Sequence, residues 1–347
     1  MKKITIRDVA REAGVSVTLV SFVMNAKADK DGRLDCPVNA DTAKRVLQVA
    51  KRLGYRKNAA AASLRSGRTN TIAVIPTDIS NKFFAGISRY IEDKAHSFGY
   101  NVLFASSDES AEKLDAIMNT MMAYSIDGVI VAPCKDSYEV ISKIVESNVP
   151  VVLLDRDLAQ MSESEVGKVL LNDREAGYMA SNSFLDKGLT RVEMISYNLG
   201  ISSLAERENG YKKAMSDRGL DMNIRVHYTS YGPDAINDVT DIVTDAVKRG
   251  VEAFFLPTYS LSSLVLSVMR EQGLKTPKDL AIVGFDESDI YNLYDNTVTH
   301  IVQPLRELAE RSVDVLHSMI EKTGGERTFI LNPEIILGGS TEDIVRK

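Results

Sequence analysis

The amino-acid sequence predicts an α/β protein with a small helical head in front of a larger body of parallel sheets. Three observations lead to this prediction. Residues 1–56 contain three amphipathic helical patterns, whereas the chain from Asn70 onward alternates β-rich runs with amphipathic helical segments. The total of 347 residues is too long for one ordinary domain and suits two or three.

The net charge of −6 conceals a difference between the two parts of the chain. Residues 1–68 carry 15 Lys and Arg against 6 Asp and Glu, whereas the remainder carries 27 against 42. A basic head on an acidic body suggests that the head meets a polyanion. The alternative is a solvated, lysine-rich helical face, which charge alone does not exclude.

Composition and motifs exclude several classes of protein. The hydrophobic fraction of 44% is ordinary for a globular chain. Cys36 and Cys134 have no metal-ligand spacing, which favours a reduced, cytoplasmic compartment. The N-terminus is unlike a signal peptide, and no run is long enough for a membrane span. Because GxGxxG, P-loop, GxSxG and HExxH motifs are lacking and the four histidines are scattered, we expect no enzyme, cofactor or metal site.

The first two helices of the head have recognisable starts. Thr5, with Asp8 three residues later, can cap the first, and Gly14 can end it in the left-handed conformation. Ser16 can cap the second. The residues of this second helix that we expect to face inward are Val20, Val23 and Met24.

The third helix completes a recognisable motif. Asn39 can cap a helix over residues 41–53, and two short helices joined by a glycine turn with a third helix predict a helix-turn-helix. Its second helix would enter the major groove of DNA, so the exposed residues of that helix would read bases. The inward residues expected in the third helix are Val46, Leu47, Val49, Ala50 and Leu53.

The head as a whole resembles a known family. The run TIRDVAREAGVSVTLVSFVMN, followed by VNADTAKRVLQVAKRLGYRKNAAAASLRSGRT, is similar to the DNA-binding head and hinge of the LacI/GalR family of bacterial transcription regulators. The likeness continues through the body. It implies a DNA-binding head over 1–56, a hinge helix and linker over 57–69, and an effector-binding and dimerisation body over 70–347. The residues implied to contact DNA are Thr5, Ser16, Val17, Thr18, Ser21, Phe22, Asn25, Tyr55, Asn58, Ala61, Leu64 and Arg65. The alternative for Phe22 is that it packs against the segment that follows the second helix, AKADKDGRLDCP.

The segment AKADKDGRLDCP is longer than the usual connection in this family. It is not a calcium loop, because the glycine of DKDGRLD directly follows the second acid. We interpret it as a polar surface excursion that contacts the DNA backbone through Lys27, Lys30 or Arg33.

The hinge segment NAAAASLRSGRT is a strong local helix former with a cap at Asn58. Taken alone, it could be an alanine-rich linker whose Leu64 packs on the body. The resemblance implies instead a helix that pairs with its dimer mate in the minor groove and wedges Leu64 between base pairs. This chain departs from the family at Lys57, where proline is usual, and at Ala62, where arginine or glutamine is common.

The body contains too many strands for one small sheet and predicts two lobes with a ligand cleft near the carboxyl ends of the strands. The resemblance implies the architecture of periplasmic sugar-binding proteins, with lobe one over about 70–171 and 304–331 and lobe two over about 172–303 and 332–347. The runs that we expect to form strands are TIAVIP, NVLFAS, GVIVAP, VPVVLLD, RVEMIS, RVHYTS, EAFFLP, LAIVGFD and THIVQP.

Two motifs of the resembling family indicate the cleft. AERENGYKKAM contains its arginine, Arg207, and LAIVGFDESD contains its aspartate, Asp286. Such a pair suits vicinal hydroxyls or a polar heterocycle, although each residue alone could be in a surface ion pair. Thr258 and Tyr259 replace a common Asn-Asp, so we expect a different sugar or a larger ligand that stacks on Tyr259. The expected cleft residues are Phe83, Phe84, Ser203, Arg207, Tyr231, Tyr259, Asp286 and Gln303, with Asp155 a weaker candidate.

These expectations describe a cytoplasmic, homodimeric transcription regulator, a repressor of a carbohydrate-related operon. It would bind double-stranded operator DNA and a sugar-like effector, with no membrane contact. One alternative keeps DNA binding but has a protein partner or a purine-like corepressor as the gating molecule. Another is a solute-binding protein of a transport system, which would need a signal peptide and would have no use for the head.

Overall fold

The computed structural model describes residues 4–26, 34–55, 67–232, 234–294, 296–342 and 344. The chain forms two compact units, the head (residues 1–69) and the body (residues 70–347). Within the described ranges, no helix combines the length and apolarity that a bilayer span requires.

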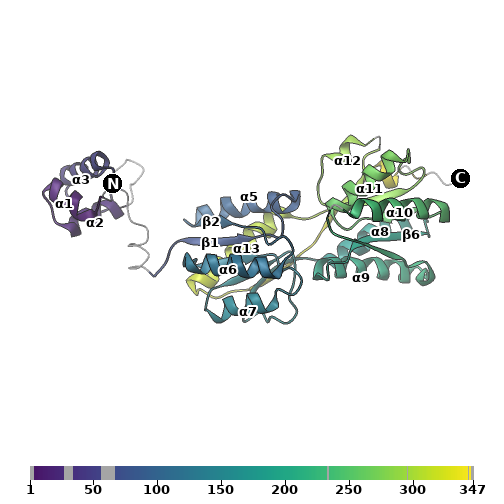
Figure 1. Cartoon of the computed structure of the whole chain (residues 1–347), viewed down its shortest axis with the longest axis horizontal. Coiled ribbons are helices and arrows are strands. Elements are labelled where there is room, and N and C mark those ends of the chain that lie inside the picture. The colour runs from purple at the N-terminus through teal and green to yellow at the C-terminus, as the bar shows by residue number, and fades with distance from the viewer. Residues whose placement is uncertain are drawn as a thin grey trace. The chain divides into compact units, whose positions relative to one another are not determined.

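The head contains three helices that begin as the sequence predicts (Figure 1). The backbone N–H of Thr5 donates to the Asp8 carboxylate at 3.0 Å, and Gly14 ends the first helix with φ of 65°. The hydroxyl of Ser16 accepts from the backbone N–H of Leu19 at 3.2 Å. The helices are α1 (Ile6–Ala13), α2 (Val17–Asn25) and α3 (Ala40–Leu53).

One expectation about the core of the head is wrong. Leu47 does not face inward but is 41% exposed, and Ala43 is buried instead. The buried stripe of α3 is centred near Val46, and each residue advances about 100° around the helix axis, so Leu47 lies beyond its edge. The other inward residues agree, with Met24 and Leu53 only partly buried. The fully buried core residues of the head are Val9, Ala10, Ala13, Val20, Val23, Ala43, Val46, Val49 and Ala50.

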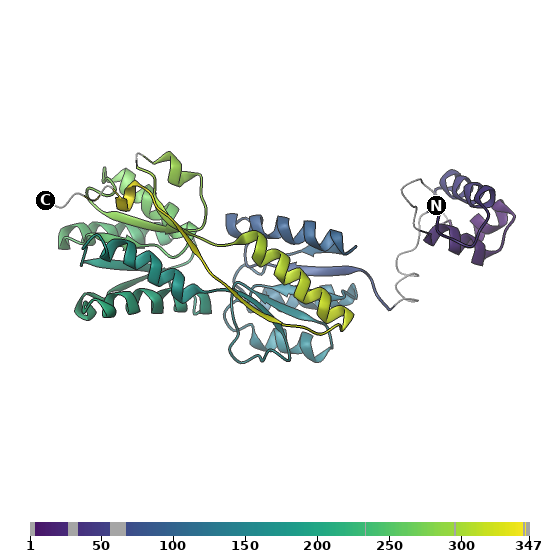
Figure 2. The same ribbon diagram turned by 180° about the vertical axis from the view of Figure 1, so that it is seen from behind.

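Lobe one of the body is a six-stranded parallel sheet in the order β11-β5-β4-β3-β1-β2. Helices α5 and α13 pack on one face, and α6 and α7 pack on the other (Figures 1 and 2). The elements are β1 (Thr71–Ile75), α5 (Lys82–Ser97), β2 (Asn101–Phe104), α6 (Ala111–Ala123), β3 (Gly128–Val131), α7 (Tyr138–Glu146), β4 (Val151–Leu154), β5 (Gly167–Leu171), α13 (Leu305–Glu321) and β11 (Thr328–Leu331).

Lobe two is a second six-stranded sheet in the order β12-β10-β9-β8-β6-β7. Helices α8 and α9 pack on one face, and α10 and α11 pack on the other. The elements are α8 (Asp173–Leu185), β6 (Val192–Tyr197), α9 (Ser202–Asp217), the 3₁₀ turn η1 (Asp221–Asn223), β7 (Val226–Thr229), α10 (Ala235–Arg249), β8 (Ala253–Phe255), α11 (Tyr259–Glu271), β9 (Ala281–Phe285), α12 (Ile290–Leu293), β10 (Thr299–Val302), β12 (Glu334–Ile336) and α14 (Gly339–Glu342).

The structure confirms the α/β class with two lobes, and each of the nine predicted runs contains a strand. Three strands were not predicted: β5, β11 and β12. β5 carries the charged Lys168 within a buried strand, where its amine pairs with Asp157 at 2.7 Å, so its sequence is not uniformly apolar. β11 and β12 are short edge strands, and β12 pairs antiparallel with β10, which corrects the expectation of purely parallel sheets.

Two features of the body determine where the residues of the site lie: the connections between the lobes and a close crossing of two helices. The chain passes between the lobes three times, near residues 172, 303 and 332 (Figure 2). Within lobe two, α8 and α9 approach so closely that a Cβ on Gly177 would lie 1.9 Å from the carbonyl oxygen of Arg207. A Cβ on Gly210 would likewise lie 2.1 Å from the carbonyl oxygen of Arg174. Only glycine fits this crossing, which brings Arg207 next to the start of α8.

Candidate functional site

The exposed face of α2 is mostly uncharged. Val17 is 41% and Phe22 is 49% exposed, and Thr18 and Asn25 are also exposed. Ser21 is half-buried, and its hydroxyl accepts from the Asn25 amide at 3.2 Å. Among the other residues predicted to contact DNA, Thr5 and Ser16 are exposed and Tyr55 is half-buried. The predicted contacts outside the described residues are Lys27, Lys30, Arg33, Asn58, Ala61, Leu64 and Arg65.

The helices that precede and follow α2 in the sequence carry positive charge. Exposed cations on α1 and α3 include Arg7, Lys44, Arg45 and Lys51. Cationic side chains bind phosphates without reading sequence, whereas base edges are read by short polar and apolar contacts. The head therefore has both kinds of surface that a DNA-binding module needs.

A small cavity of about 50 Å³ lies between the two lobes of the body. This volume holds a few water molecules and is well below that of ordinary ligand pockets. A second cavity of about 720 Å³ adjoins it and shares Asp155, Arg156 and Ile201 with it. The predicted residues that line the small cavity are Phe83, Phe84, Asp155, Ser203, Arg207, Tyr231, Asp286 and Gln303.

Tyr259 is the one predicted residue that does not line this cavity. It is the first residue of α11, and the residues on either side of it, Thr258 and Ser260, line the cavity instead. The Thr258 hydroxyl caps the helix by accepting from the N–H of Leu261 at 3.2 Å. The structure therefore gives no support to a ligand stacked on Tyr259.

Arg207 is held at the cavity by contacts on three sides. It is 4% exposed, and its Nε donates to the Asp173 carboxylate at 2.7 Å. Its Nη1 donates to the backbone carbonyl of Pro257 at 2.7 Å, and its guanidinium carbon lies 3.8 Å from the centre of the Phe285 ring. These contacts fix the plane of the guanidinium before any ligand arrives.

A second guanidinium, which sequence reasoning missed, lies on the lobe-one side. Both terminal nitrogens of Arg156 bond the two carboxylate oxygens of Glu109, each at 2.8 Å. Both residues line the cavity, and Arg156 is 7% exposed. No motif marks Glu109, but Arg156 directly follows the strand run VPVVLLD, which was a usable signal.

Asp155 and Asp286 occupy matching places in the two lobes. Each directly follows a central strand, β4 or β9, and each adopts a left-handed backbone, with φ of 68° and 64°. This conformation is unfavourable for residues other than glycine, although Asp and Asn tolerate it best. Strain at the carboxyl ends of strands is typical of functional positions.

Burial raises the pKa of all three aspartates around Arg207. It raises the pKa of Asp155 and Asp286 in spite of the nearby guanidinium of Arg207. It also raises the pKa of Asp173 to about 7, although Arg207 bonds this carboxylate. These buried carboxyl groups therefore favour their neutral forms more than an exposed aspartate does.

Two buried polar atoms in the cavity have no hydrogen-bond partner among the described residues. The Gln303 amide donates to the Asp286 carboxylate at 2.8 Å, but its oxygen, Oε1, has no donor. The Nε of Arg156 forms no hydrogen bond, although the Asp155 carboxylate lies 3.5 Å from it. Buried polar atoms are almost always paired in native proteins. The cavity is therefore prepared for a polar ligand that offers both a donor and an acceptor.

Comparison with known proteins agrees with these features. Residues 5–58 match bacterial regulatory proteins of the lacI family, and residues 72–325 match the periplasmic binding protein domain. Catabolite control protein A of Priestia megaterium is 30% identical over 336 residues, covering 96% of this chain and 97% of that protein. HTH-type transcriptional repressor PurR of Vibrio campbellii is 28% identical over 345 residues, covering 98% and 99%.

Solved structures show the same fold. The lac repressor dimer bound to operator and the anti-inducer ONPF is 20% identical, with a TM-score of 0.82 over 98% of this chain and 99% of that chain. A lacI family regulator from Silicibacter pomeroyi is 22% identical, with a TM-score of 0.78 over 96% and 98%. Together with the sequence matches, these findings show that the chain belongs to the lacI family of bacterial regulatory proteins, which are DNA-binding transcription regulators.

Proposed function

We propose that this regulator is a homodimeric repressor gated by a small polar molecule that binds between the lobes of the body. The observation that carries the proposal is a pair of buried polar atoms without a hydrogen bond, Gln303 Oε1 and Arg156 Nε, in the interlobe cavity. We assign DNA binding to residues 1–56, the hinge to 57–69 and effector binding to 70–347. We place the protein in the cytoplasm, with no catalytic activity.

The arrangement of charges supports a mechanism of lobe closure. A ligand in the cavity would contact Asp155 and Arg156 of lobe one and Arg207 and Asp286 of lobe two. The lobes already touch where the Asp157 N–H donates to the Ser202 hydroxyl at 2.7 Å. A bridging ligand changes the balance between open and closed lobes, and this would alter the spacing of the paired hinges. Such coupling is reciprocal, so operator DNA must change ligand affinity by the same factor.

A sugar or sugar derivative is the first candidate for the ligand. Guanidinium and carboxylate groups in fixed positions bond adjacent hydroxyls well. A purine-like corepressor is the second candidate, which relatives named PurR favour. The rings of Tyr197 and Tyr231, whose centres lie 5.2 Å apart at the cavity, could contact a flat heterocycle.

Two measurements on the full-length protein test the proposal. Selection from random DNA gives the operator, and thermal-shift screening of sugars and purines gives the ligand, because specific binding stabilises the folded body. We expect the ligand to change operator affinity in the wild type and to lose its effect in Arg207→Ala. A ligand that stabilises both proteins equally would show that it binds outside the cavity.

A test of the predicted hinge uses Leu64→Ala. If the side chain acts as a wedge, the substitution weakens operator binding much more than binding to random DNA, because only the operator complex is kinked. Both affinities are measured at one salt concentration, with Lys44→Ala, which removes an exposed cation of α3, as a control that should weaken both. If Leu64→Ala lowers the affinity for operator and for random DNA equally, Leu64 packs on the body and is not a wedge.

A further inference from the structure

The cavity between the lobes contains more negative than positive groups. Two carboxylates come from lobe one, Glu109 and Asp155, and Asp286 comes from lobe two. Asp173 adds a fourth through its bond to Arg207. The cations that line the cavity among the described residues are two guanidiniums, those of Arg156 and Arg207.

The hydrogen bonds show which carboxylates are not bonded by a guanidinium. Arg156 is committed to Glu109 through both terminal nitrogens, and Arg207 is committed to Asp173 and a backbone carbonyl. Asp155 lies 3.5 Å from Arg156 Nε and 3.9 Å from Arg207 Nη2, distances too long for good hydrogen bonds. The Asp286 carboxylate accepts a hydrogen bond from the neutral Gln303 amide. Asp155 thus shares both guanidiniums with acids that they bond more closely, and the hydrogen bond that Asp286 accepts from a side chain comes from a neutral amide.

The Gln303 side-chain oxygen, which accepts no hydrogen bond, independently indicates a ligand that carries hydrogen-bond donors. Gln303 is 5% exposed, and its nitrogen is used by Asp286, so its Oε1 can only accept a hydrogen bond. Asp155, Asp286 and this oxygen are acceptors, and a ligand that satisfies all three must supply several N–H or O–H donors. A positive charge on the ligand also offsets the surplus of buried carboxylates, which hydroxyls alone cannot do.

We infer that the effector is a polyol that carries a protonated amine, such as an amino sugar, with the ammonium group held between Asp155 and Asp286. This inference rests on the proposed effector site and specifies its ligand. The hydroxyls of such a ligand would meet Arg156 Nε and Gln303 Oε1.

A proton balance follows from this assignment. Burial holds the pKa of Asp155 and Asp286 above its ordinary value and that of Asp173 at about 7, and an ammonium group beside these carboxyls favours their ionised forms. Binding of an amine therefore releases protons to the buffer, whereas binding of a neutral sugar does not. The titratable and charged groups around the cavity are Asp78, Glu109, Asp155, Asp173, Asp286, Arg156, Arg207, Tyr197, Tyr231 and Tyr291.

The experiment compares matched ligands on the full-length protein at pH 7. D-glucosamine, D-galactosamine and D-mannosamine are tested by thermal shift and calorimetry against the parent hexoses and the N-acetyl derivatives. We expect at least one amine to bind roughly tenfold or more tightly than its neutral counterparts, because only the amine meets both aspartates. Calorimetry in two buffers of different ionisation enthalpy should show protons released by the amine alone.

Variants make the test specific. Asp155→Asn and Asp286→Asn keep the shape and tolerate the left-handed backbone, so they should fold and lose the preference for the amine. Glu139→Gln, which removes an exposed carboxylate on α7, should behave as the wild type. The inference is overturned if no amine binds, or if a neutral sugar binds as tightly as its amine without proton release. A neutral ligand that still alters operator affinity would leave the proposed function standing, whereas an amine that binds without altering operator affinity would overturn the proposed function alone.

Discussion

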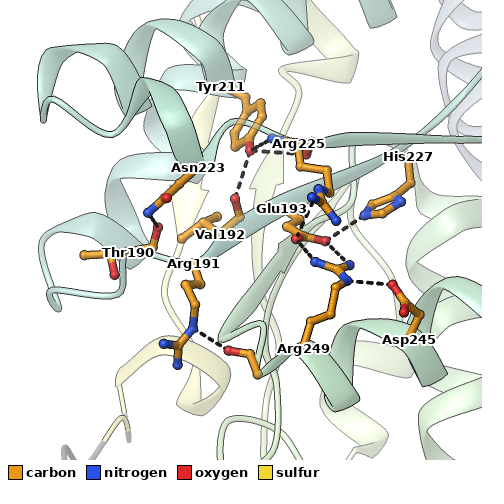
Figure 3. Close-up of polar contacts among 11 residues, drawn as sticks. Thr190, Arg191, Val192, Glu193, Tyr211, Asn223, Arg225, His227, Asp245 and Arg249 are labelled. Carbon is orange, nitrogen blue, oxygen red and sulfur yellow. Dashed lines mark hydrogen bonds and ion pairs between the residues drawn. The ribbon is translucent and has the colours of Figure 1, made fainter.

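Two charged clusters lie at opposite ends of the lobe-two sheet. At the amino end, Glu193 of β6 is a single buried carboxylate among cations (Figure 3). The Arg249 Nη2 donates to it at 2.9 Å, and His227 lies at 2.6 Å. At the carboxyl end, the guanidinium of Arg207 lies among the carboxylates of Asp155, Asp173 and Asp286.

The two clusters differ in the pKa of their acids. Burial alone would raise the pKa of Glu193, but hydrogen bonds from Arg249 and His227 outweigh it and lower the pKa to about 2. Burial of Asp173 is not outweighed, and its pKa rises to about 7. The cluster around Glu193 thus compensates its buried charge through its own hydrogen bonds, whereas burial is not fully compensated in the cluster at the cavity.

Helix α9 links the two ends. It carries Arg207 into the cavity, and one turn later Tyr211 reaches the other end, where its hydroxyl lies 2.8 Å from the Val192 carbonyl and accepts from the Arg225 N–H at 3.0 Å (Figure 3). Gly210 between them allows the close crossing with α8. A shift of this helix should therefore disturb both clusters together.

The largest effect is expected for Gly210→Val. The new side chain would meet the Arg174 carbonyl, so α8 and α9 must separate, and the free energy of unfolding should fall by about 3 kcal/mol or more. Urea unfolding measures the change, with the neighbouring exposed Asn209→Ala as control. A loss below about 1 kcal/mol would mean that the two helices are not held at this distance.

Glu193→Gln should break the compensated cluster at a cost of about 3 kcal/mol at pH 7, because the substitution removes the buried carboxylate that Arg249 and His227 bond. The pKa of Glu193 in the folded protein, about 2, lies below its ordinary value of 4.5. Its contribution to stability is therefore present above pH 4.5 and lost as the pH falls through about 2. Unfolding curves from pH 7 down to pH 3 should converge for wild type and variant. Asp245→Asn, which removes an exposed partner of Arg249, is the control and should cost far less.

The opposite pH dependence is expected for Asp173→Asn. The pKa of Asp173 in the folded protein, about 7, lies above its ordinary value of 3.8. Its contribution is full below pH 3.8 and is lost as the pH rises through about 7, so the ligand-free wild type should weaken over this range. The variant should show a flatter profile between pH 5 and pH 8 in thermal unfolding. A steeper decline in the variant would contradict the assignment of this slope to Asp173.

The smallest effect on stability is expected for Phe22→Arg, which leaves both clusters untouched. Phe22 is 49% exposed on α2, so the change should cost less than about 0.5 kcal/mol. Phenylalanine offers no hydrogen bond to a base, and it can contact a thymine methyl, whereas arginine bonds guanine. We predict an operator that favours A·T pairs under α2 and a new guanine preference in the variant. Site selection from random DNA with both proteins checks this, and identical site preferences would show that Phe22 does not face the bases.

The contrast between the clusters also shows which residues of the site could be predicted from the sequence. Arg207 and Asp286 were predicted because each belongs to a recognisable motif at the end of a strand or helix. The bond between Arg156 and Glu109 joins residues 47 positions apart in two loops, so no local pattern marks it. Tyr259 does not line the small cavity, although its neighbours Thr258 and Ser260 do, and which of the three does so depends on the first turn of α11.

Burial is the property that sequence reasoning could least supply. The apolar runs predicted nine strands, but β5 escaped because Lys168 interrupts it, and its ion pair with Asp157 appears only in the fold. In the same way, the acidic balance of the whole body does not tell which carboxylates are buried around one arginine. The surplus charge in the cavity is therefore a finding of the structure.

The most direct test of the contrast compares two substitutions of equally buried acids. Asp155 and Glu193 are each 6% exposed, and both substitutions remove one negative charge and keep the shape of the side chain. In the ligand-free, full-length protein at pH 7.5, we predict that Asp155→Asn raises the melting temperature and Glu193→Gln lowers it. If both substitutions lower the melting temperature by similar amounts, the acids at the cavity are compensated like those at the far end, and the account of a site awaiting its ligand is wrong.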